Sequence, residues 1–399
     1  MDLQPILSAL KRQKLTCLLI MLEVALAFAI ISNATFIIAQ RVERISIDSG
    51  VTSRELVRIR TASLTEEDAR VRGIEDTAAL RQLAGVVSVA AIQQVPFGEA
   101  SWNGGLAVSR EQRSGYLNVS EYYDGGGMLT TLGLRLIAGR DFSAEEYVDS
   151  EDATARVVII TQSVAVKLWP GQSALGRAVY ESDHELRVVG VVADLVRSAP
   201  HDPHLAYDSI IMPMRGEAYR RGQFVLRVRD EAQAAQVIAA ARAVLHKLQP
   251  NRLLLYADTL HDLQDNYFRQ DRVMAGLLLA AVVALLLVTA LGIVGLASFW
   301  VQQRRRQIGI RRALGATRAR IRHYFQQENL LIVSGGIVVG TLAAYLINGW
   351  LMRHYELPRL PLAYFPISVI AMLVLGQLAA LAPALRAMEV SPALTVRGQ

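Results

Sequence analysis

The chain has 399 residues, 52% of them hydrophobic, with a formal net charge of +6 and one cysteine. A single cysteine excludes an intrachain disulfide, so a folded domain must be held together by its own apolar core. Residues 41–272 carry 27 Lys and Arg against 31 Asp and Glu, whereas the rest carries 15 against 5. The excess basic residues lie at the ends of long apolar runs, as expected for a membrane protein, and this placement argues against nucleic-acid binding.

Four apolar runs are long enough to cross a bilayer, which takes about 20 helical residues for a hydrocarbon layer of ~30 Å. The first run follows three basic residues and exceeds the apolar region of a cleaved signal, so we interpret it as an uncleaved anchor. The predicted transmembrane helices are residues 15–40, 273–300, 329–350 and 364–385.

Charge predicts the orientation of these helices. Segment 1–14 and loop 301–328 are basic, so both are expected in the cytoplasm. Residues 41–272 and the short loop 351–363 then lie outside, and segment 386–399 lies inside. The predicted fold is an α-helical membrane protein with four transmembrane helices and a large extracytoplasmic domain between helices 1 and 2, with both termini cytoplasmic.

The domain 41–272 has the pattern of a mixed α/β fold. Short β-rich runs alternate with helical patterns, and a glycine or a proline follows the two longer helices. Strands are predicted at 155–160, 186–192, 209–212, 223–228 and 252–256, and helices at 65–83, 163–168 and 232–248.

The segment Arg304–Phe325 holds eight arginines and no acid. Gly315 is a natural helix stop, and Thr317 suits the start of a second helix. The pattern predicts a helix, a sharp turn and a helix, with a small apolar knob at residues 314–316 surrounded by arginines. On charge alone such a loop is a topogenic, lipid-facing segment, but it could also dock in a cleft of another protein.

The order of residues in this segment is informative. Gln307–Arg318, followed by Ile321, Phe325 and Glu328, resembles the signature of the MacB/FtsX-like permease family. Further motifs resemble the same family in the same order along the chain. They begin at Gly139 (GRDFS), Leu168 (LWP), Leu175 (LGR), Val188 (VVGVV), Pro383 (PALRAM) and Ser391 (SPAL).

The resemblance implies a permease subunit of an ABC-type export or mechanotransmission complex in the bacterial inner membrane. Its implied partners are a separate cytoplasmic ABC ATPase, a second copy of the chain, a periplasmic adaptor and an outer-membrane duct. By the same analogy the domain splits into a porter-like part (45–130 and 205–265) and a sabre-like part (131–204). The residues expected to couple to the ATPase are Ile308, Ile310, Arg311, Arg312, Leu314, Gly315, Ala316, Thr317 and Arg318.

The chain shows no catalytic machinery of its own. A P-loop needs Gly-Lys-Ser/Thr, and none of the four lysines follows a glycine. No motif indicates a metal site, a cofactor site, a protease or an acyl transferase. We therefore predict a non-catalytic subunit, with ATP hydrolysis on a partner chain.

Three residues within the spans are predicted to serve helix packing. Glu23 lies about 12 Å along the first span, where a charge is costly, so we expect it to be neutral and hydrogen-bonded to Thr16, Ser32 or a partner helix. Gly336 and Gly340 form a Gly-x-x-x-Gly motif, which permits close helix contact within one chain or between two copies.

Two other functions share this architecture and stay open at this point. One is a sensory or regulatory membrane protein that transmits a signal. The other is a complex that activates cell-wall hydrolases by a mechanical stroke. The sequence does not identify a cargo.

Overall fold

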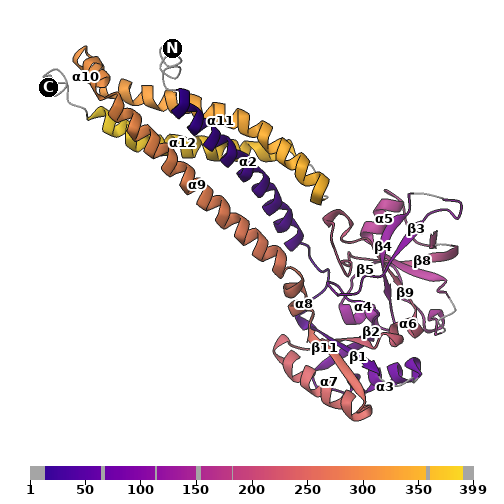
Figure 1. Cartoon of the computed structure of the whole chain (residues 1–399). Helices are drawn as coiled ribbons and strands as arrows, with labels where there is room; N and C mark the ends of the chain where they lie inside the picture. The colour runs from indigo at the N-terminus through magenta and orange to yellow at the C-terminus, as the bar shows by residue number, and fades with distance from the viewer. Residues whose placement is uncertain are drawn as a thin grey trace. The chain divides into compact units, whose positions relative to one another are not determined.

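The computed structural model describes residues 14–63, 68–112, 115–149, 154–181, 183–355 and 360–389. Segment 1–13 and segment 390–399, which holds the motif at Ser391, lie outside the described residues, as do 65–67 of the first predicted domain helix and 356–359 of the predicted outer loop. The chain divides into two compact units: Glu43–Gln270, and the residues before and after it. One unit is made of long helices and the other of two sheets with covering helices (Figure 1).

The helical unit contains four helices that are long and apolar enough to span a membrane, counted in the described part of the chain. Each extends beyond the predicted apolar run because the polar turns at its ends are also helical. The predicted fold class is therefore confirmed. The helices of this unit are α2 (Lys14–Ile45), α9 (Arg269–Gln303), α10 (Arg305–Ala313), α11 (Arg318–Tyr355) and α12 (Phe365–Met388), with a short 3-10 turn at Leu362–Tyr364.

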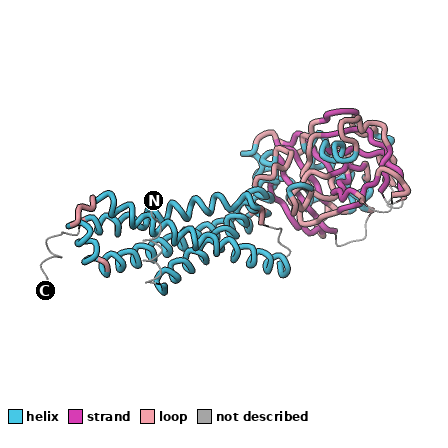
Figure 2. Tube along the Cα trace, turned by 90° about the horizontal axis from the view of Figure 1, so that it is seen from above, coloured by secondary structure: helices cyan, strands magenta, loops and turns pink. Residues whose placement is uncertain are grey.

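The long helices of this unit run side by side (Figure 2). Of the four, α2 is the most enclosed by its neighbours. Phe28 of α2 is fully buried and stacks on Phe365 of α12, with ring centroids 6.0 Å apart. Asn33 of α2 donates a hydrogen bond of 3.3 Å to the carbonyl of Ala344 in α11. A polar contact of this kind fixes the register of two helices where lipid offers no hydrogen-bonding alternative.

The domain Glu43–Gln270 contains two sheets. The first is antiparallel, with strand order β11 (Arg252–Thr259), β1 (Leu56–Ser63), β10 (Gln223–Val228) and β2 (Val86–Ala91). Helices α3 (Ala69–Arg81) and α7 (Ala234–Leu248) contact it. In α7 the buried residues Val237, Ala241 and Leu245 recur every four positions, so one helical face covers the sheet.

The second sheet is mixed and has seven strands. Strands β4 and β9 pair in parallel, as do β6 and β8, and the other pairs are antiparallel. Because β8 also pairs with β7, six of the strands close into a ring. The order is β5 (Leu136–Gly139), β8 (His184–Val192), β6 (Val157–Thr161), β9 (Ser209–Met212), β4 (Leu117–Tyr123), β3 (Asn103–Ala107) and β7 (Ala178–Glu181).

Short helices complete this domain. Asp124 accepts hydrogen bonds from the backbone N–H groups of Gly126 and Met128, so its carboxylate organises the glycine-rich turn that begins α4. The remaining helices are α4 (Met128–Leu132), α5 (Gln162–Leu168), α6 (Arg215–Arg220) and α8 (Leu260–Tyr267), with 3-10 turns at Ser53–Glu55, Ala144–Glu146, Pro203–Leu205 and Glu231–Gln233.

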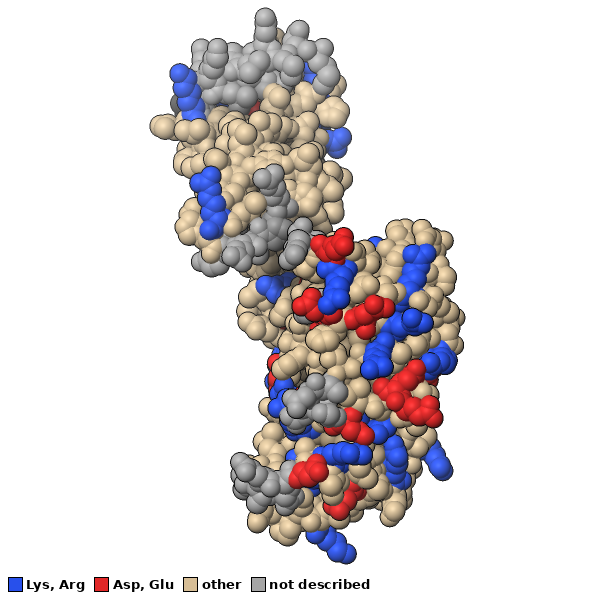
Figure 3. All heavy atoms as spheres, turned by 90° about the vertical axis from the view of Figure 1, so that its right-hand side faces the viewer, with Lys and Arg blue, Asp and Glu red and all other residues tan. Residues whose placement is uncertain are grey.

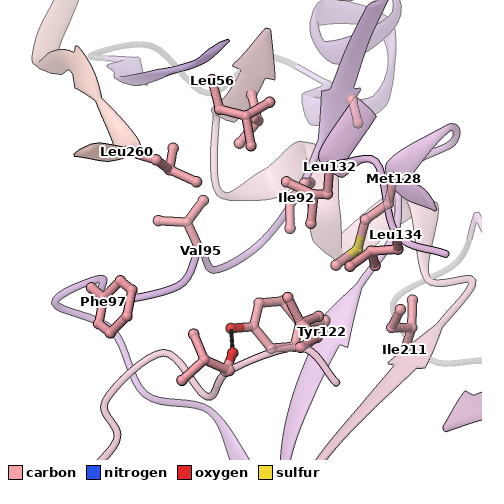
Figure 4. Packing of buried hydrophobic residues seen from close by; sticks show 14 of the residues in the cluster. Leu56, Ile92, Val95, Phe97, Tyr122, Met128, Leu132, Leu134, Ile211 and Leu260 are labelled. Atoms are coloured by element: carbon pink, nitrogen blue, oxygen red, sulfur yellow. Dashed lines mark hydrogen bonds between the residues drawn. The ribbon is translucent and has the colours of Figure 1, made fainter. Parts of the chain in front are cut away.

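One apolar cluster is shared by both sheets of the domain (Figure 4). Leu56 comes from the first sheet, Tyr122 and Ile211 come from the second, and Leu260 comes from α8. The hydroxyl of Tyr122 donates a hydrogen bond of 2.7 Å to the carbonyl of Val196, so the largest side chain of the cluster buries no unpaired polar group.

The seven-stranded sheet contains strands from both the expected porter-like and the expected sabre-like segments. Strands β3, β4 and β9 fall in segments 45–130 and 205–265, yet all three belong to the seven-stranded sheet with the strands of 131–204. The physical reason is the parallel pairing of β4 with β9, which joins residues almost ninety positions apart and leaves no trace in local sequence patterns.

Candidate functional site

The arginine-rich segment forms an elbow, defined here as residues 304–318. Helix α9 ends at Gln303, α10 begins at Arg305, and α11 begins at Arg318 (Figure 1). Gly315 has φ +93°, and its N–H bonds the carbonyl of Arg312 while the N–H of Ala316 bonds that of Arg311. This pair of bonds is a Schellman motif, which needs a left-handed residue and therefore favours glycine.

Thr317 begins the second arm of the elbow. Its hydroxyl oxygen accepts a hydrogen bond of 3.3 Å from the backbone N–H of Arg320. A threonine in this position satisfies a backbone donor that the first turn of a helix leaves unpaired. The structure therefore has a helix, a turn and a second helix at the positions where the sequence places them.

The nine residues expected to couple to an ATPase divide into two groups. Leu314 is 83% exposed and Ile310 is 46% exposed, and their spacing of four positions puts them next to each other as an exposed apolar patch of the elbow. Ile308 is only 5% exposed and packs with Ile321 of α11 and Ala387 of α12, so it contacts its own chain. Gly315, Thr317 and Arg318 are exposed, and Ala316 is half-buried.

Two arginines of α10 bind to neighbouring helices. The guanidinium of Arg311 lies 5.0 Å from the ring centroid of Tyr324 in α11. Arg312 donates from Nη1 to the carbonyl of Met388 at the end of α12, at 3.0 Å. Part of the positive charge is thus used to attach the elbow to the bundle.

A further contact was not anticipated from the sequence. Arg304, at the break between α9 and α10, donates from Nη1 to both carboxylate oxygens of Glu328 in α11, at 2.9 and 3.0 Å. The side chains are 12% and 1% exposed. The only sequence signal for this pair is an isolated acid at the end of an arginine-rich run, because nothing local indicates which arginine it would bind.

Glu23 lies against α9. A Cβ added at Gly292 would come within 2.3 Å of its Oε1, so that glycine makes room for the carboxyl group. Of the three expected partners, Thr16, Ser32 and a neighbouring helix, Ser32 is not bonded to Glu23, since its Oγ has no hydrogen-bond partner. The reason is packing: the carboxyl group points toward the neighbouring helix rather than along its own.

Gly336 and Gly340 lie against α2 in the same chain. A Cβ at Gly336 would come within 2.7 Å of the Val24 side chain, and one at Gly340 would come within 2.7 Å of the Ala25 carbonyl and 3.0 Å of Phe28. The two glycines thus let α11 approach α2 more closely than any other residue would allow.

The surfaces of the two units differ in charge. Lys and Arg are interspersed with Asp and Glu over the visible face of the domain, whereas the helical unit shows mainly uncharged side chains (Figure 3). Among the described residues no group of three or more His, Cys, Asp and Glu side chains is placed to hold a metal ion. Large apolar side chains are exposed along the long helices, as a lipid-facing surface requires.

Two family models match the chain. Residues 15–244 match the MacB-like periplasmic core domain, and residues 279–392 match the FtsX-like permease C-terminal domain. Together they cover the first long helix, the domain as far as residue 244, most of α9, and the elbow with α11 and α12.

Curated relatives include the macrolide export ATP-binding/permease protein MacB of Neisseria meningitidis serogroup A, which is 27% identical over 269 residues, covering 66% of this chain and 39% of the relative. The protein of the same name from Bdellovibrio bacteriovorus is 26% identical over 232 residues, covering 54% of this chain and 35% of the relative. The chain thus spans less than half the length of these relatives.

Solved structures with similarity include the periplasmic region of MacB from Actinobacillus actinomycetemcomitans, at 17% identity and a TM-score of 0.36, covering 56% of this chain and 97% of that one. The extracellular domain of the noncanonic ABC-type transporter YknZ from Gram-positive bacteria has 15% identity and a TM-score of 0.34, covering 50% and 100%. Because the periplasmic core model alone matches more than half of the residues, the chain belongs to the MacB/FtsX-like permease family.

Proposed function

We propose that this chain is the permease of an ABC-type mechanotransmission complex. A cytoplasmic ATPase binds the exposed patch of the elbow, and its ATP-driven movement passes along the long helices to the domain Glu43–Gln270. By chain connection α2 and α9 enter that domain directly, so displacement of either helix acts on it. The domain then handles a cargo or a periplasmic adaptor protein.

The observation that carries this proposal is the exposed apolar patch on the elbow. Leu314 stands 83% exposed at the tip of a turn whose neighbours are arginines. A leucine in this setting has little to contact within its own chain, and it fits an apolar pocket of a partner protein rimmed by acidic residues. The curated relatives are named ATP-binding/permease proteins, which supports an ATPase as that partner.

ATP hydrolysis is supplied from outside these 399 residues, since no lysine in them follows a glycine as a P-loop requires. The basic elbow favours a cytoplasmic location for it, with the domain on the opposite side of a bacterial inner membrane and both termini inside. A second copy of the chain completes the complex.

The test is purification of the tagged chain in mild detergent, followed by identification of its partners. Leu314→Asp should lower recovery of the ATPase on the order of tenfold while membrane insertion is unchanged, because a charged side chain disfavours an apolar pocket. Leu362→Asp is the matched control, since Leu362 is 71% exposed but lies between α11 and α12. Equal ATPase recovery with Leu314→Asp and with the unchanged chain would contradict the proposed docking site.

A further inference from the structure

The break between α9 and α10 is a single residue wide. Arg304 leaves helical geometry with φ −98° and ψ 9°. Arg304 itself keeps helix-like hydrogen bonds on both sides, because its N–H donates to the carbonyl of Trp300 and its carbonyl accepts from the N–H of Ile308, both at 3.0 Å. The backbone here forms a kink between two helices, and a kink is a place where one helix can bend relative to the next.

The side chain of Arg304 restrains that kink. Its two hydrogen bonds to Glu328 attach the kink to α11, and its guanidinium lies 5.8 Å from the ring centroid of Trp300 in α9. Parts of α9 and α11 therefore meet at this ion pair.

The rest of α10 is held by different contacts. In its middle, Ile308 packs with Ile321 and Ala387, and at its end Arg312 bonds the carbonyl of Met388. The apolar contacts resist separation but permit sliding, because dispersion forces have no preferred direction. The Arg304–Glu328 pair is directional, since one guanidinium nitrogen donates to both oxygens of the carboxylate and is thereby held at one position against α11.

Burying such a pair is a poor way to gain stability, because the desolvation of two charges offsets most of their attraction. The better attested use of a buried polar pair is to select one arrangement over others. We propose that Arg304 and Glu328 form a positioning joint that makes the elbow and α11 move as one body. This inference rests on the proposed function and names the residues through which its movement enters the bundle.

Without the joint, the elbow would still present Leu314 to an ATPase, but the displacement would be absorbed by bending at the kink. A chain without the joint should therefore still bind the ATPase but no longer transmit its movement. A residue needed only for folding would lower both together, so the separation distinguishes a joint from a merely structural contact.

The experiment uses the full chain in lipid nanodiscs, alone and with its co-purified ATPase. The variants are Arg304→Glu, Glu328→Arg, their combination, and Glu328→Gln, which keeps the shape of the side chain and removes its charge. Arg305→Glu is the matched control, because Arg305 is the next residue, is exposed, and has the same charge change. The readouts are amide hydrogen exchange, followed by mass spectrometry, and the amount of ATPase retained.

In the chain alone, the α10 amides should exchange on the order of tenfold faster in each single variant at positions 304 and 328. The exchange rate should return to that of the natural chain in the combined variant, where the pair is re-formed with its charges exchanged. With the ATPase, the single variants should retain the partner but lose the ATP-dependent change in exchange over residues 43–270. The combined variant should regain that change, and Arg305→Glu should keep it.

Two results would overturn the joint: unchanged α10 exchange in the single variants, or an intact ATP-dependent change in the domain despite a broken pair. A chain with its natural sequence that retains no ATPase would instead contradict the proposed function. In that case the exchange of α10 in the chain alone still decides whether the pair holds the elbow.

Discussion

Replacing Glu121 with Gln should make the stability of the domain Glu43–Gln270 less sensitive to pH. Glu121 lies on β4 and is 2% exposed, and Glu181 ends β7 on the other side of β3. A Cβ at Gly104 of β3 would come within 1.6 Å of Glu121 Oε1 and 3.4 Å of Glu181 Oε1. The two carboxyl groups therefore meet over a glycine in the strand between them.

Burial is the main cause that raises the pKa of Glu121, and together with the nearby carboxyl group of Glu181 it brings the pKa from its ordinary value of 4.5 to about 8. A hydrogen bond of 3.1 Å from the Tyr123 hydroxyl acts in the opposite direction. Because the pKa of Glu121 is higher in the folded state than in the unfolded state, binding of its proton stabilises the fold. This contribution of Glu121 to the free energy of unfolding is complete below pH 4.5 and is lost as the pH rises toward 8.

The size of the loss follows from the slope of about 1.4 kcal/mol per pH unit for one proton. Between pH 5 and pH 7 the free energy of unfolding should fall by about 2–3 kcal/mol from this group alone. For a domain of this length that corresponds to roughly 5–10 °C in melting temperature. Glutamine cannot ionise and has nearly the same shape as glutamate, so Glu121→Gln should keep its stability over this range.

The assay is thermal unfolding of the chain in detergent from pH 5 to pH 8. The difference between the natural chain and Glu121→Gln should widen with pH in favour of the variant. Glu185→Gln is the control, because Glu185 lies on the neighbouring part of β8 but is exposed. Parallel pH curves for the natural chain and Glu121→Gln would refute the idea that Glu121 keeps its proton near neutral pH.

Two further substitutions test the packing. Gly340→Val should lower the stability of the helix bundle by about 1–3 kcal/mol in thermal unfolding, because the added atoms meet the α2 backbone. Gly349→Val is the control and should cost far less, because there is open space at its Cβ. Equal effects of the two variants would contradict the close contact between α2 and α11. Arg252→Met should lower the free energy of unfolding of the domain by about 3–5 kcal/mol in the same assay, since it leaves the carboxylate of Asp76 buried without its cation. A decrease below about 1 kcal/mol, as for a surface ion pair, would contradict the buried pairing.

Much of the helical unit could be predicted from the sequence. A run of about 20 apolar residues is costly to leave in water, whatever the rest of the chain does, so the four spans follow from local composition. The elbow is local too: Gly315 has the positive φ that ends α10, and Thr317 caps α11 through residues at most five positions away. The exposed position of Leu314 follows from that turn.

Less of the domain Glu43–Gln270 could be predicted from the sequence. Strand β9 was predicted with its observed bounds, Ser209–Met212, because it is a short apolar run between turn signals. Strand β3 was missed, because Asn103, Gly104 and Gly105 have low strand propensity. Gly104 occupies a strand because two carboxyl groups from neighbouring strands need the space of a side chain, a requirement that no local pattern carries.

The sequence by itself determined which segments enter a membrane, the class of the domain between them, the helix–turn–helix of the elbow, and the family. These depend on transfer free energies, charge and backbone preferences that act over a few residues. Only the tertiary structure decided that β4 pairs with β9, that Arg304 binds Glu328, and that Glu23 lies against Gly292 rather than bonding Ser32. Each of these joins residues far apart in the chain, and the choice among many possible partners is made by the packing of the whole fold.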